Sequence, residues 1–413
     1  MKKRASQRWL PLLLYLLAVA TLFGFIAGFG WTRTWSAIFA GTMPALSPPF
    51  ADMRGIQGAV TSADQGLNPL ISNPNDPWHR PLNYPPIWVK IGQAANLPDE
   101  TRFIQFCSLM IFFFVAICAY LLYRFPSYLL LACAVSTATL FGIERANNDL
   151  IIYALVFVFA LVFPRKLSPV PILIATVLKL YPVFLLGVLL IKRQFILFFT
   201  ALIFALAIFG YMWDQLPFIG RSAGPAAISG WTYERVASYG FPIIALHLSE
   251  YKLPSWMMAG VIIVISLIIF VVALYFRKIK SYLMQTDRLD FSLFLAGSSI
   301  YLGTFIFSPN WDYRLIFLIF CVPFLEKKRF PLGSFLVILI IVAMNDRILT
   351  PWLGEPGLAI VWFAKILVFA VLCGYLAAFV PTIFNFRRSA SEAITRSKQE
   401  SIDLNEGYFS DTR

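Results

Sequence analysis

Long apolar runs cover most of this chain, and short polar connections separate them. A hydrocarbon core about 30 Å thick needs roughly 20 apolar residues in a helix. Only helices and closed barrels satisfy their backbone groups in lipid, and these runs lack the alternation of a barrel strand. The pattern predicts an all-α, polytopic helical membrane protein with about twelve spans. We place the spans at residues 9–30, 102–123, 127–143, 149–163, 168–179, 181–191, 195–212, 255–276, 291–307, 313–325, 331–344 and 358–378.

Two neighbouring runs, 168–179 and 181–191, are too short to cross a membrane without tilt. We interpret them as one short broken or re-entrant hairpin, with Lys179-Leu180-Tyr181-Pro182 at its tip. Broken helices at membrane depth are tolerated only where protein or a wet cavity surrounds them. The break therefore predicts a covered, polar region at this point of the chain.

The pattern predicts one integral membrane domain over residues 1–380. Two long loops interrupt it, at residues 31–101 and 213–254, and we expect both on the extracytoplasmic side. Residues 381–413 mix Ser, Glu, Lys and Arg without apolar periodicity, which indicates a solvated cytoplasmic tail.

Charge sets the expected orientation. Only 13% of the residues are charged, yet the net charge is +13. Most Lys and Arg residues lie in the two tails and in short loops on the side that carries both termini, which marks that side as cytoplasmic. Orientation and anionic headgroups thus account for the charge without nucleic acid. The five cysteines form no CxxC pair and are interpreted as packing residues.

The acidic residues favour the opposite side, and Asp52 stands out among them. It lies in the run SPPFADMR, residues 47–54, just past the first span. Met53, Ile56 and Val60 recur at helical spacing, which predicts a short amphipathic helix on the membrane surface. Asp52 is then either its N-cap, worth about 1 kcal/mol, or a catalytic base. The residues alone leave both roles open.

Three further polar motifs are expected on the same side. Residues 142–149 read GIERANND between two apolar runs; a capped turn explains Asn148 or Asp149 but not Glu144 and Arg145. Lys179 at the hairpin tip could simply extend to the interface.

The third motif reads SPNWDYR over residues 308–314. Asp312 and Arg314 are two residues apart and cannot share one helical face, so each needs its own partner. The planar fork of an arginine suits a phosphate.

These motifs follow one order: a loop-one Asp, Tyr84-Pro85-Pro86, the Asn-Asn-Asp turn, the Lys-Leu-Tyr-Pro tip and the Ser-Pro-Asn-Trp-Asp-Tyr turn. That order resembles the polyprenol-phosphate-sugar-dependent membrane glycosyltransferases of family 87 in the GT-C superfamily, and is similar to bacterial alpha-mannosyltransferases. The resemblance covers most of residues 9–378. Some members carry a histidine in the turn that matches residues 310–313, where this chain has none.

The resemblance implies an inverting sugar transfer, with mannose favoured, at the outer face of a bacterial inner membrane. Asp52 would be the base, as in the first extracytoplasmic loop of such enzymes. A departing polyprenyl phosphate needs cations or donors around its charge. We expect Arg145, Lys179 and Arg314 to bind this donor phosphate. The expected substrate contacts are Tyr84, Glu144, Asn148, Asp149, Asn310, Asp312 and His79.

We expect no cofactor and no metal, since no Walker A, Rossmann, HExxH or DxD-like motif is present. The expected partners are a polyprenyl-phosphate sugar donor, a lipid or glycan acceptor and membrane lipids. Two alternatives remain. A secondary transporter or flippase of a lipid-linked or sugar substrate fits many spans and a broken hairpin, although no second copy of loop one or of the Asn-Asn-Asp turn is found. An O-antigen ligase or polymerase using a diphosphate carrier would be expected to use a large late outer loop with paired arginines.

Overall fold

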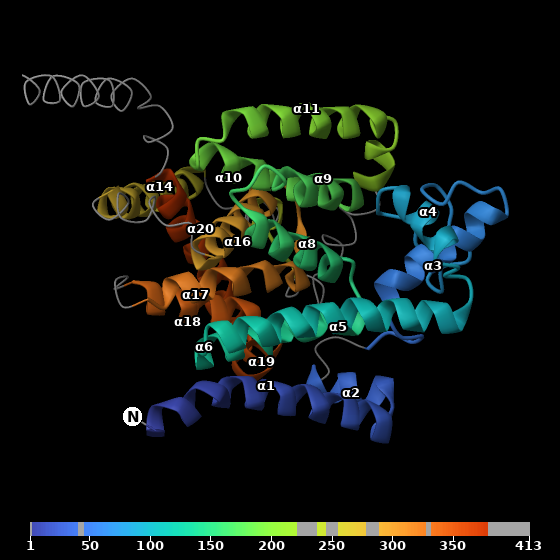
Figure 1. Ribbon diagram of the computed structural model, residues 1–413, viewed down its shortest axis with the longest axis horizontal. Coiled ribbons are helices and arrows are strands. Elements are labelled where there is room, and N and C mark those ends of the chain that lie inside the picture. The colour runs from blue at the N-terminus through green and yellow to red at the C-terminus, as the bar shows by residue number, and fades with distance from the viewer. Residues whose placement is uncertain are drawn as a thin grey trace, which may run out of the picture.

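Helices form nearly all the regular structure in the computed structural model, which describes residues 2–39, 45–220, 238–244, 255–277, 289–327 and 332–378 (Figure 1). The first half contains α1 (Lys2–Phe29), α2 (Trp31–Ile38), α3 (Ala51–Asp64), α4 (Ile87–Ala94), α5 (Glu100–Arg124), α6 (Tyr128–Ala134), α7 (Thr137–Arg145), α8 (Asp149–Val162), α9 (Pro169–Leu178), η1 (Tyr181–Leu185), α10 (Leu186–Ile191) and α11 (Phe195–Tyr211). The second contains β1 (Ser238–Tyr239), α14 (Ser255–Arg277), α16 (Leu289–Phe307), β2 (Asn310–Trp311), η2 (Asp312–Cys321), α17 (Val322–Leu325), α18 (Gly333–Met344), α19 (Asp346–Leu353) and α20 (Glu355–Ala377). The predicted all-α class is confirmed. The tail at 381–413 and most of the loop at 213–254 lie outside the described residues.

Five stretches are long and apolar enough to cross a membrane: Arg8–Phe29, Glu100–Arg124, Tyr128–Arg145, Leu289–Phe307 and Glu355–Ala377. A sixth is added if α18 and α19, which meet at a bend of 74°, form one span. Several other predicted spans are shorter apolar helices, such as α8 and α9. A count of twelve therefore stays a prediction. Apolar side chains such as Leu17, Phe112 and Ile203 are more than half exposed, as expected of surfaces that face lipid.

The predicted break at the hairpin tip is confirmed. Helix α9 ends at Leu178, and the 3₁₀-helix η1 begins at Tyr181 with Pro182 in its first turn. The predicted span 313–325 also departs from a regular α-helix, because residues 312–321 form the 3₁₀-helix η2. Helix α16 packs closely on η2: a Cβ added at Gly297 would lie 2.4 Å from the Phe317 carbonyl oxygen. A glycine permits this approach of two backbones.

Loop one forms a folded cap at one end of the helices. Helices α3 and α4 lie at the end of the molecule away from the N-terminus (Figure 1). The predicted amphipathic helix is present as α3, with Met53, Ile56 and Val60 fully buried. Trp88 of α4 donates its indole N–H to the Leu178 carbonyl oxygen at 2.8 Å, beside Lys179. The cap is thus attached to the broken hairpin.

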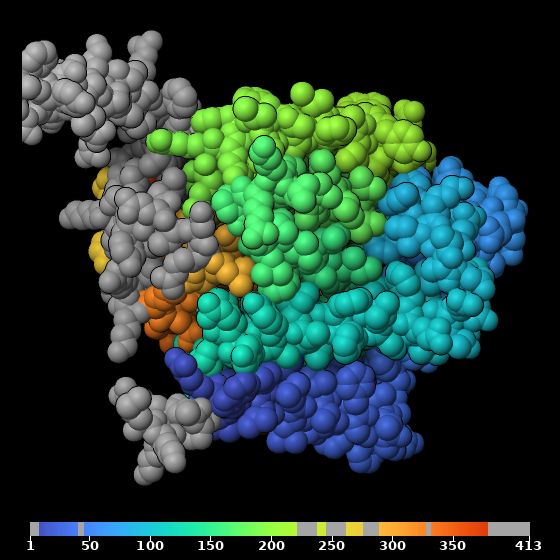
Figure 2. Space-filling model, in the orientation of Figure 1, coloured from blue at the N-terminus to red at the C-terminus, as the bar shows by residue number. Residues whose placement is uncertain are grey.

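The polar turns that were predicted on the same side as loop one lie together at one end of the molecule. The turns that follow α7, α9 and β2 meet beside loop one through hydrogen bonds and ion pairs described below. At the other end, the Ser127 hydroxyl donates to Glu326 at 2.6 Å, which joins two turns predicted on the opposite side. In Figure 2, the side chains of α1 and α2 form one edge of the molecule, and α5 separates them from α8 and α9.

Candidate functional site

Asp52 is the second residue of α3, not its N-cap. The N-cap position belongs to Phe50, which adopts a left-handed conformation (φ 68°, ψ 45°) and makes no side-chain cap bond. The alternative in which Asp52 caps the helix is therefore wrong, because the helix begins two residues earlier than a cap at Asp52 requires. The carboxylate is available to other partners, and 16% of its side chain is exposed.

Asn147 connects Asp52 with the turn between α7 and α8. Its amide nitrogen donates to Asp52 Oδ2 at 2.5 Å. Its amide oxygen accepts from the Asp149 backbone N–H at 2.8 Å and from Lys179 Nζ at 3.3 Å. The two donors on the oxygen fix the orientation of the amide. Asn148 occupies the N-cap position of α8, as expected, but its side chain makes no cap hydrogen bond. The side chain that accepts from the first turn of α8 is Asn147, which follows the left-handed Ala146 (φ 44°).

Asp149 gathers two cations at this turn. Lys179 Nζ lies 2.6 Å from its Oδ1, and Arg314 Nε lies 3.3 Å from its Oδ2. The Tyr181 hydroxyl also donates to Oδ1, at 2.7 Å. Lys179 Nζ donates to the Asn148 amide oxygen at 2.6 Å as well. Lys179 is thus held inside the protein by three oxygens and does not extend to the interface.

Aromatic rings surround these cations. Lys179 Nζ lies 5.1 Å from the centre of the Tyr84 ring and 5.9 Å from that of Tyr313. Arg314 Cζ lies 4.6 Å from the Tyr181 ring. Tyr84 belongs to loop one, outside the spanning helices, and its hydroxyl accepts from Asn147 at 3.4 Å. Burial and the nearby Asp52 carboxylate raise the pKa of Tyr84 well above its usual value, so its phenol stays neutral.

A second arginine approaches Asp52 from loop one. Arg80 Nη1 lies 3.9 Å from Asp52 Oδ1, and 39% of the Arg80 side chain is exposed. The buried Asp76 holds the guanidinium at 3.0 Å and 2.9 Å, and the Ala51 carbonyl oxygen accepts from Nη2 at 2.6 Å. Gly58 makes room for this segment, since a Cβ there would lie 2.5 Å from the Asp76 nitrogen.

Glu144 and Arg145 form an ion pair of 2.9 Å beside the start of loop one. Glu144 Oε1 accepts from the Leu46 backbone N–H at 3.3 Å. Arg145 Cζ lies 5.2 Å from the Phe141 ring, whose centre lies 5.3 Å from that of Tyr313. Arg145 is thus paired with Glu144, whereas the other two expected phosphate ligands, Lys179 and Arg314, are paired with Asp149.

In the third motif, residues 308–314, Asp312 and Arg314 have different partners, as predicted. Asn310 accepts from Arg314 and from the Ser308 hydroxyl, and its amide nitrogen donates to the Thr304 carbonyl oxygen at 2.7 Å. Asp312 instead accepts from Lys365 Nζ at 2.8 Å on both oxygens, and neither side chain is exposed. Asp312 therefore lies apart from the Asp149 ion pairs, as a sealed partner of α20.

His79 is the other expected substrate contact that the structure leaves apart. It is exposed, and its Nδ1 lies 3.0 Å from the Pro74 carbonyl oxygen. Within the described parts of the chain, no group of three His, Cys, Asp or Glu residues could hold a metal ion.

Several residues of the site were not predicted. Asn147 and Tyr181 adjoin predicted residues in their motifs, and Tyr313 lies within the third motif. Lys365 had a clear signal, because a lysine inside a 23-residue apolar helix is a functional hypothesis by default. Arg80 had none, since one arginine in a polar loop is unremarkable in sequence.

Comparisons of the chain with protein-family models, with curated proteins and with solved structures each found no match. The resemblance to family 87 therefore stays a prediction, and the site's own geometry carries the functional argument.

Proposed function

We propose that the protein is an inverting glycosyltransferase that moves a sugar, with mannose favoured, from a polyprenyl phosphate to a lipid- or glycan-borne hydroxyl on the extracytoplasmic side. One observation carries the proposal: an accessible carboxylate, Asp52, is fixed by Asn147, which also accepts from the cation Lys179. The Asn147 amide thus holds a base, Asp52, close to a cation, Lys179. This arrangement suits a reaction in which a proton is removed while negative charge develops nearby.

The charge of the site fits such a donor. Lys179 and Arg314 share the single carboxylate of Asp149, which leaves this group one net positive charge, whereas Arg80 is paired with Asp76 and Arg145 with Glu144. A sugar phosphodiester carries one negative charge, and the departing phosphate gains a second. Lys179 and Arg314 would stabilise this added charge, since buried cations act most strongly in a low dielectric.

The step balances with these residues alone. Asp52 takes the proton of the acceptor hydroxyl, whose oxygen forms a bond to the anomeric carbon. The bond from that carbon to the phosphate oxygen breaks, and its electron pair leaves with the polyprenyl phosphate. Oδ1 is the oxygen that accepts the proton, because Oδ2 is occupied by Asn147. Asp52 afterwards loses the proton to water.

Asp52→Asn tests this role. We expect sugar transfer from a polyprenyl-phosphate donor to fall by at least about a hundredfold, because a general base contributes roughly 10²–10⁴. Product is measured by mass spectrometry after incubation with a panel of polyprenyl-phosphate sugars and one diphosphate-linked sugar. Asp64→Asn, at the other end of α3, is the matched control, and both variants should elute as monodisperse protein. Wild-type turnover by Asp52→Asn would exclude Asp52 as base; transfer only from the diphosphate would favour a ligase or polymerase.

A secondary transporter is the second candidate. Two interrupted helical segments, α9–η1 and α18–α19, carry charged residues at their breaks, as in transporters that bind substrate at broken helices. However, Asp346 and Arg347 at the second break are almost completely buried. Uptake of a lipid-linked sugar into proteoliposomes without formation of a new glycoside would favour the transporter.

A further inference from the structure

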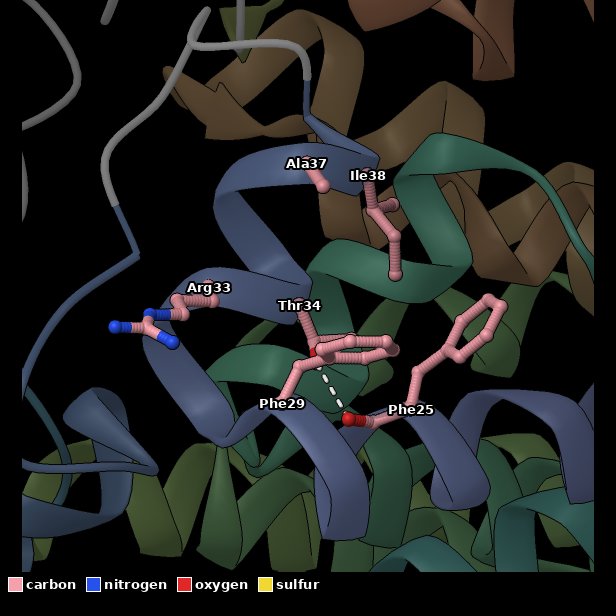
Figure 3. A pocket seen from close by; sticks show the side chains of 6 residues that line it. All are labelled: Phe25, Phe29, Arg33, Thr34, Ala37 and Ile38. Atoms are coloured by element: carbon pink, nitrogen blue, oxygen red, sulfur yellow. Dashed lines mark hydrogen bonds between the residues drawn. The ribbon is translucent and has the colours of Figure 1, made fainter.

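Two adjoining apolar hollows form a groove beside α1, which lies on the opposite side of α5 from α9 (Figure 1). Its outer part, a hollow of about 430 Å³, lies where α1 and α2 meet at Gly30, and Phe25, Phe29 and Ile38 line it (Figure 3). Its inner part, also about 430 Å³, lies between α1 and the pair α6–α7, and shares Phe25 and Ile38 with the first. Nothing in the proposed reaction uses this groove.

The walls are mostly apolar, and their polar side chains are Arg33 and Thr34 in the outer part and Tyr15 and Thr21 in the inner part. The hydroxyl of Thr34 donates to the Phe25 carbonyl oxygen at 3.0 Å and lies 2.8 Å from that of Gly30, so it is satisfied within the helices (Figure 3). Groups such as Leu14, Ala18 and Leu140 complete the inner part. A mostly apolar groove of this kind suits a hydrocarbon chain.

A cation marks the outer end of the groove. Arg33 lines the outer hollow, and its guanidinium extends away from the Phe25 and Phe29 rings (Figure 3). Arg33 is exposed and has no ion pair with any residue that the structure describes. It lies at the end of α1 opposite the basic N-terminus, where an arginine can reach the headgroup layer. An apolar groove with a cation at one end matches an anionic lipid.

The length of the groove points to an ordinary lipid. From Leu14 to Phe25 the helix rises about 16 Å at 1.5 Å per residue, which is about half of a 30 Å hydrocarbon core. That distance matches one chain of a lipid within a single leaflet. A polyprenyl chain is much longer and would extend past the groove.

We propose that this groove binds one acyl chain of an anionic glycerophospholipid, whose phosphate is held by Arg33. The site lies in the leaflet next to loop one. It is independent of the proposed reaction, because it uses none of the residues around Asp52. Ile143, which lines the inner end, precedes Glu144 by one residue, so an occupied groove supports the helix that carries the Glu144–Arg145 pair.

The test measures binding of dioleoylphosphatidylglycerol to the full-length, delipidated protein in detergent, and native mass spectrometry counts the lipids bound. We expect one lipid to bind more tightly than those that follow. Ala18→Phe fills the groove and should weaken this first binding at least about tenfold. Ala20→Phe is the matched control, because Ala20 is exposed on α1 but does not line the groove. Arg33→Gln should remove the preference over dioleoylphosphatidylcholine, whereas Arg102→Gln should not.

Equal affinity in wild type and Ala18→Phe would overturn the site. An unchanged headgroup preference in Arg33→Gln would overturn the role of the phosphate. Undecaprenyl phosphate is the competing probe: displacement of phosphatidylglycerol by this lipid in wild type, but not in Ala18→Phe, would assign the groove to the donor's chain and also overturn the proposal. Sugar transfer is not the readout, so failure here leaves the role of Asp52 to its own test.

Discussion

Two buried ion-pair groups of similar composition lie on either side of the start of η2, and they differ in exposure. Asp149 with Lys179 and Arg314 forms the open group, where 10% and 12% of the two cationic side chains are exposed. Asp312 with Lys365 forms the sealed group, where neither side chain is exposed. The open group adjoins Asp52 through Asn147, whereas the sealed group contacts α20 and the Ser238 carbonyl oxygen.

The difference separates a substrate-binding role from a positioning role. A buried ion pair gives little net stability, but breaking one leaves an uncompensated charge. Asp312 and Arg314 are two residues apart on η2, so the bond from Asp312 to Lys365 fixes the segment that presents Arg314 to Asp149. The sealed group thus positions the open one.

The largest expected effect comes from Lys365→Met. Asp312 would then be a buried carboxylate without its cation, which costs about 3–5 kcal/mol. We expect a clear fall in the Tm of the detergent-purified protein. Intrinsic fluorescence during heating measures this Tm. Lys179→Met should lower Tm much less, because Arg314 and Tyr181 still contact Asp149. It should nevertheless lower sugar transfer about a hundredfold, as removal of a transition-state donor does.

The double variant Asp312→Leu with Lys365→Met is the control for that comparison. Replacing both partners by apolar residues is often close to neutral, so most of the lost stability should return. The comparison between the groups fails if Lys365→Met folds with the wild-type Tm, or if Lys179→Met transfers sugar at the wild-type rate.

Gly58→Ala is expected to have the next largest effect, on the loop-one wall of the open group. Its Cβ would lie 2.5 Å from the Asp76 nitrogen and 2.7 Å from the Asn75 carbonyl oxygen, and backbone atoms cannot yield as a side chain can. Overpacking of this kind costs about 1–3 kcal/mol and would displace the segment that holds Arg80 near Asp52.

Gly55→Ala on the same helix is the matched control. Its Cβ would meet only Arg80 Nη2, at 3.6 Å, and Asp76 Oδ1, at 3.7 Å, which are ordinary contacts. Alanine is favoured over glycine inside a helix by about 0.5–1 kcal/mol, so this variant should be slightly stabilised. Tm and sugar transfer are measured for both; equal behaviour of the two variants would show that loop one is not tightly packed at Gly58.

The sequence predicted elements better than contacts. Apolar length and proline placement were sufficient for the helical class and for the break at Lys179, because both depend on local chemistry. The divergent partners of Asp312 and Arg314 also followed from spacing alone. The start of α3 did not, since the left-handed Phe50 is an uncommon conformation for a bulky residue and no local preference indicates it.

Long-range contacts explain what the sequence could not show. Asn147 and Asp52 are 95 residues apart, and Lys365 and Asp312 are 53 apart. Short motifs named the turns that meet, but only the packing of α3 on α7 decides which side chain faces Asp52. Two of the five non-glycine residues with positive φ among the described residues, Phe50 and Ala146, stand directly before α3 and Asn147. Such residues concentrate at functional sites, where surrounding structure holds them.

The smallest effect is expected from Tyr84→Phe, which alters the open group without disturbing its charges. The hydroxyl receives only a 3.4 Å hydrogen bond from Asn147, whose shorter bond to Asp52 remains. A neutral hydrogen bond is worth about 0.5–1.5 kcal/mol, so sugar transfer should fall by no more than about tenfold.

The pH profile distinguishes a neutral phenol from an ionising one. Because burial and Asp52 raise the pKa of Tyr84 well above its usual value, the phenol keeps its proton at every pH below that raised pKa. Tyr84 then contributes no limb to the dependence of kcat/KM on pH, and the wild-type and Tyr84→Phe profiles should be parallel between about pH 6 and 9. An alkaline limb present in wild type and absent in the variant would show that Tyr84 ionises in this range. The open group would then be more hydrated than its contacts indicate.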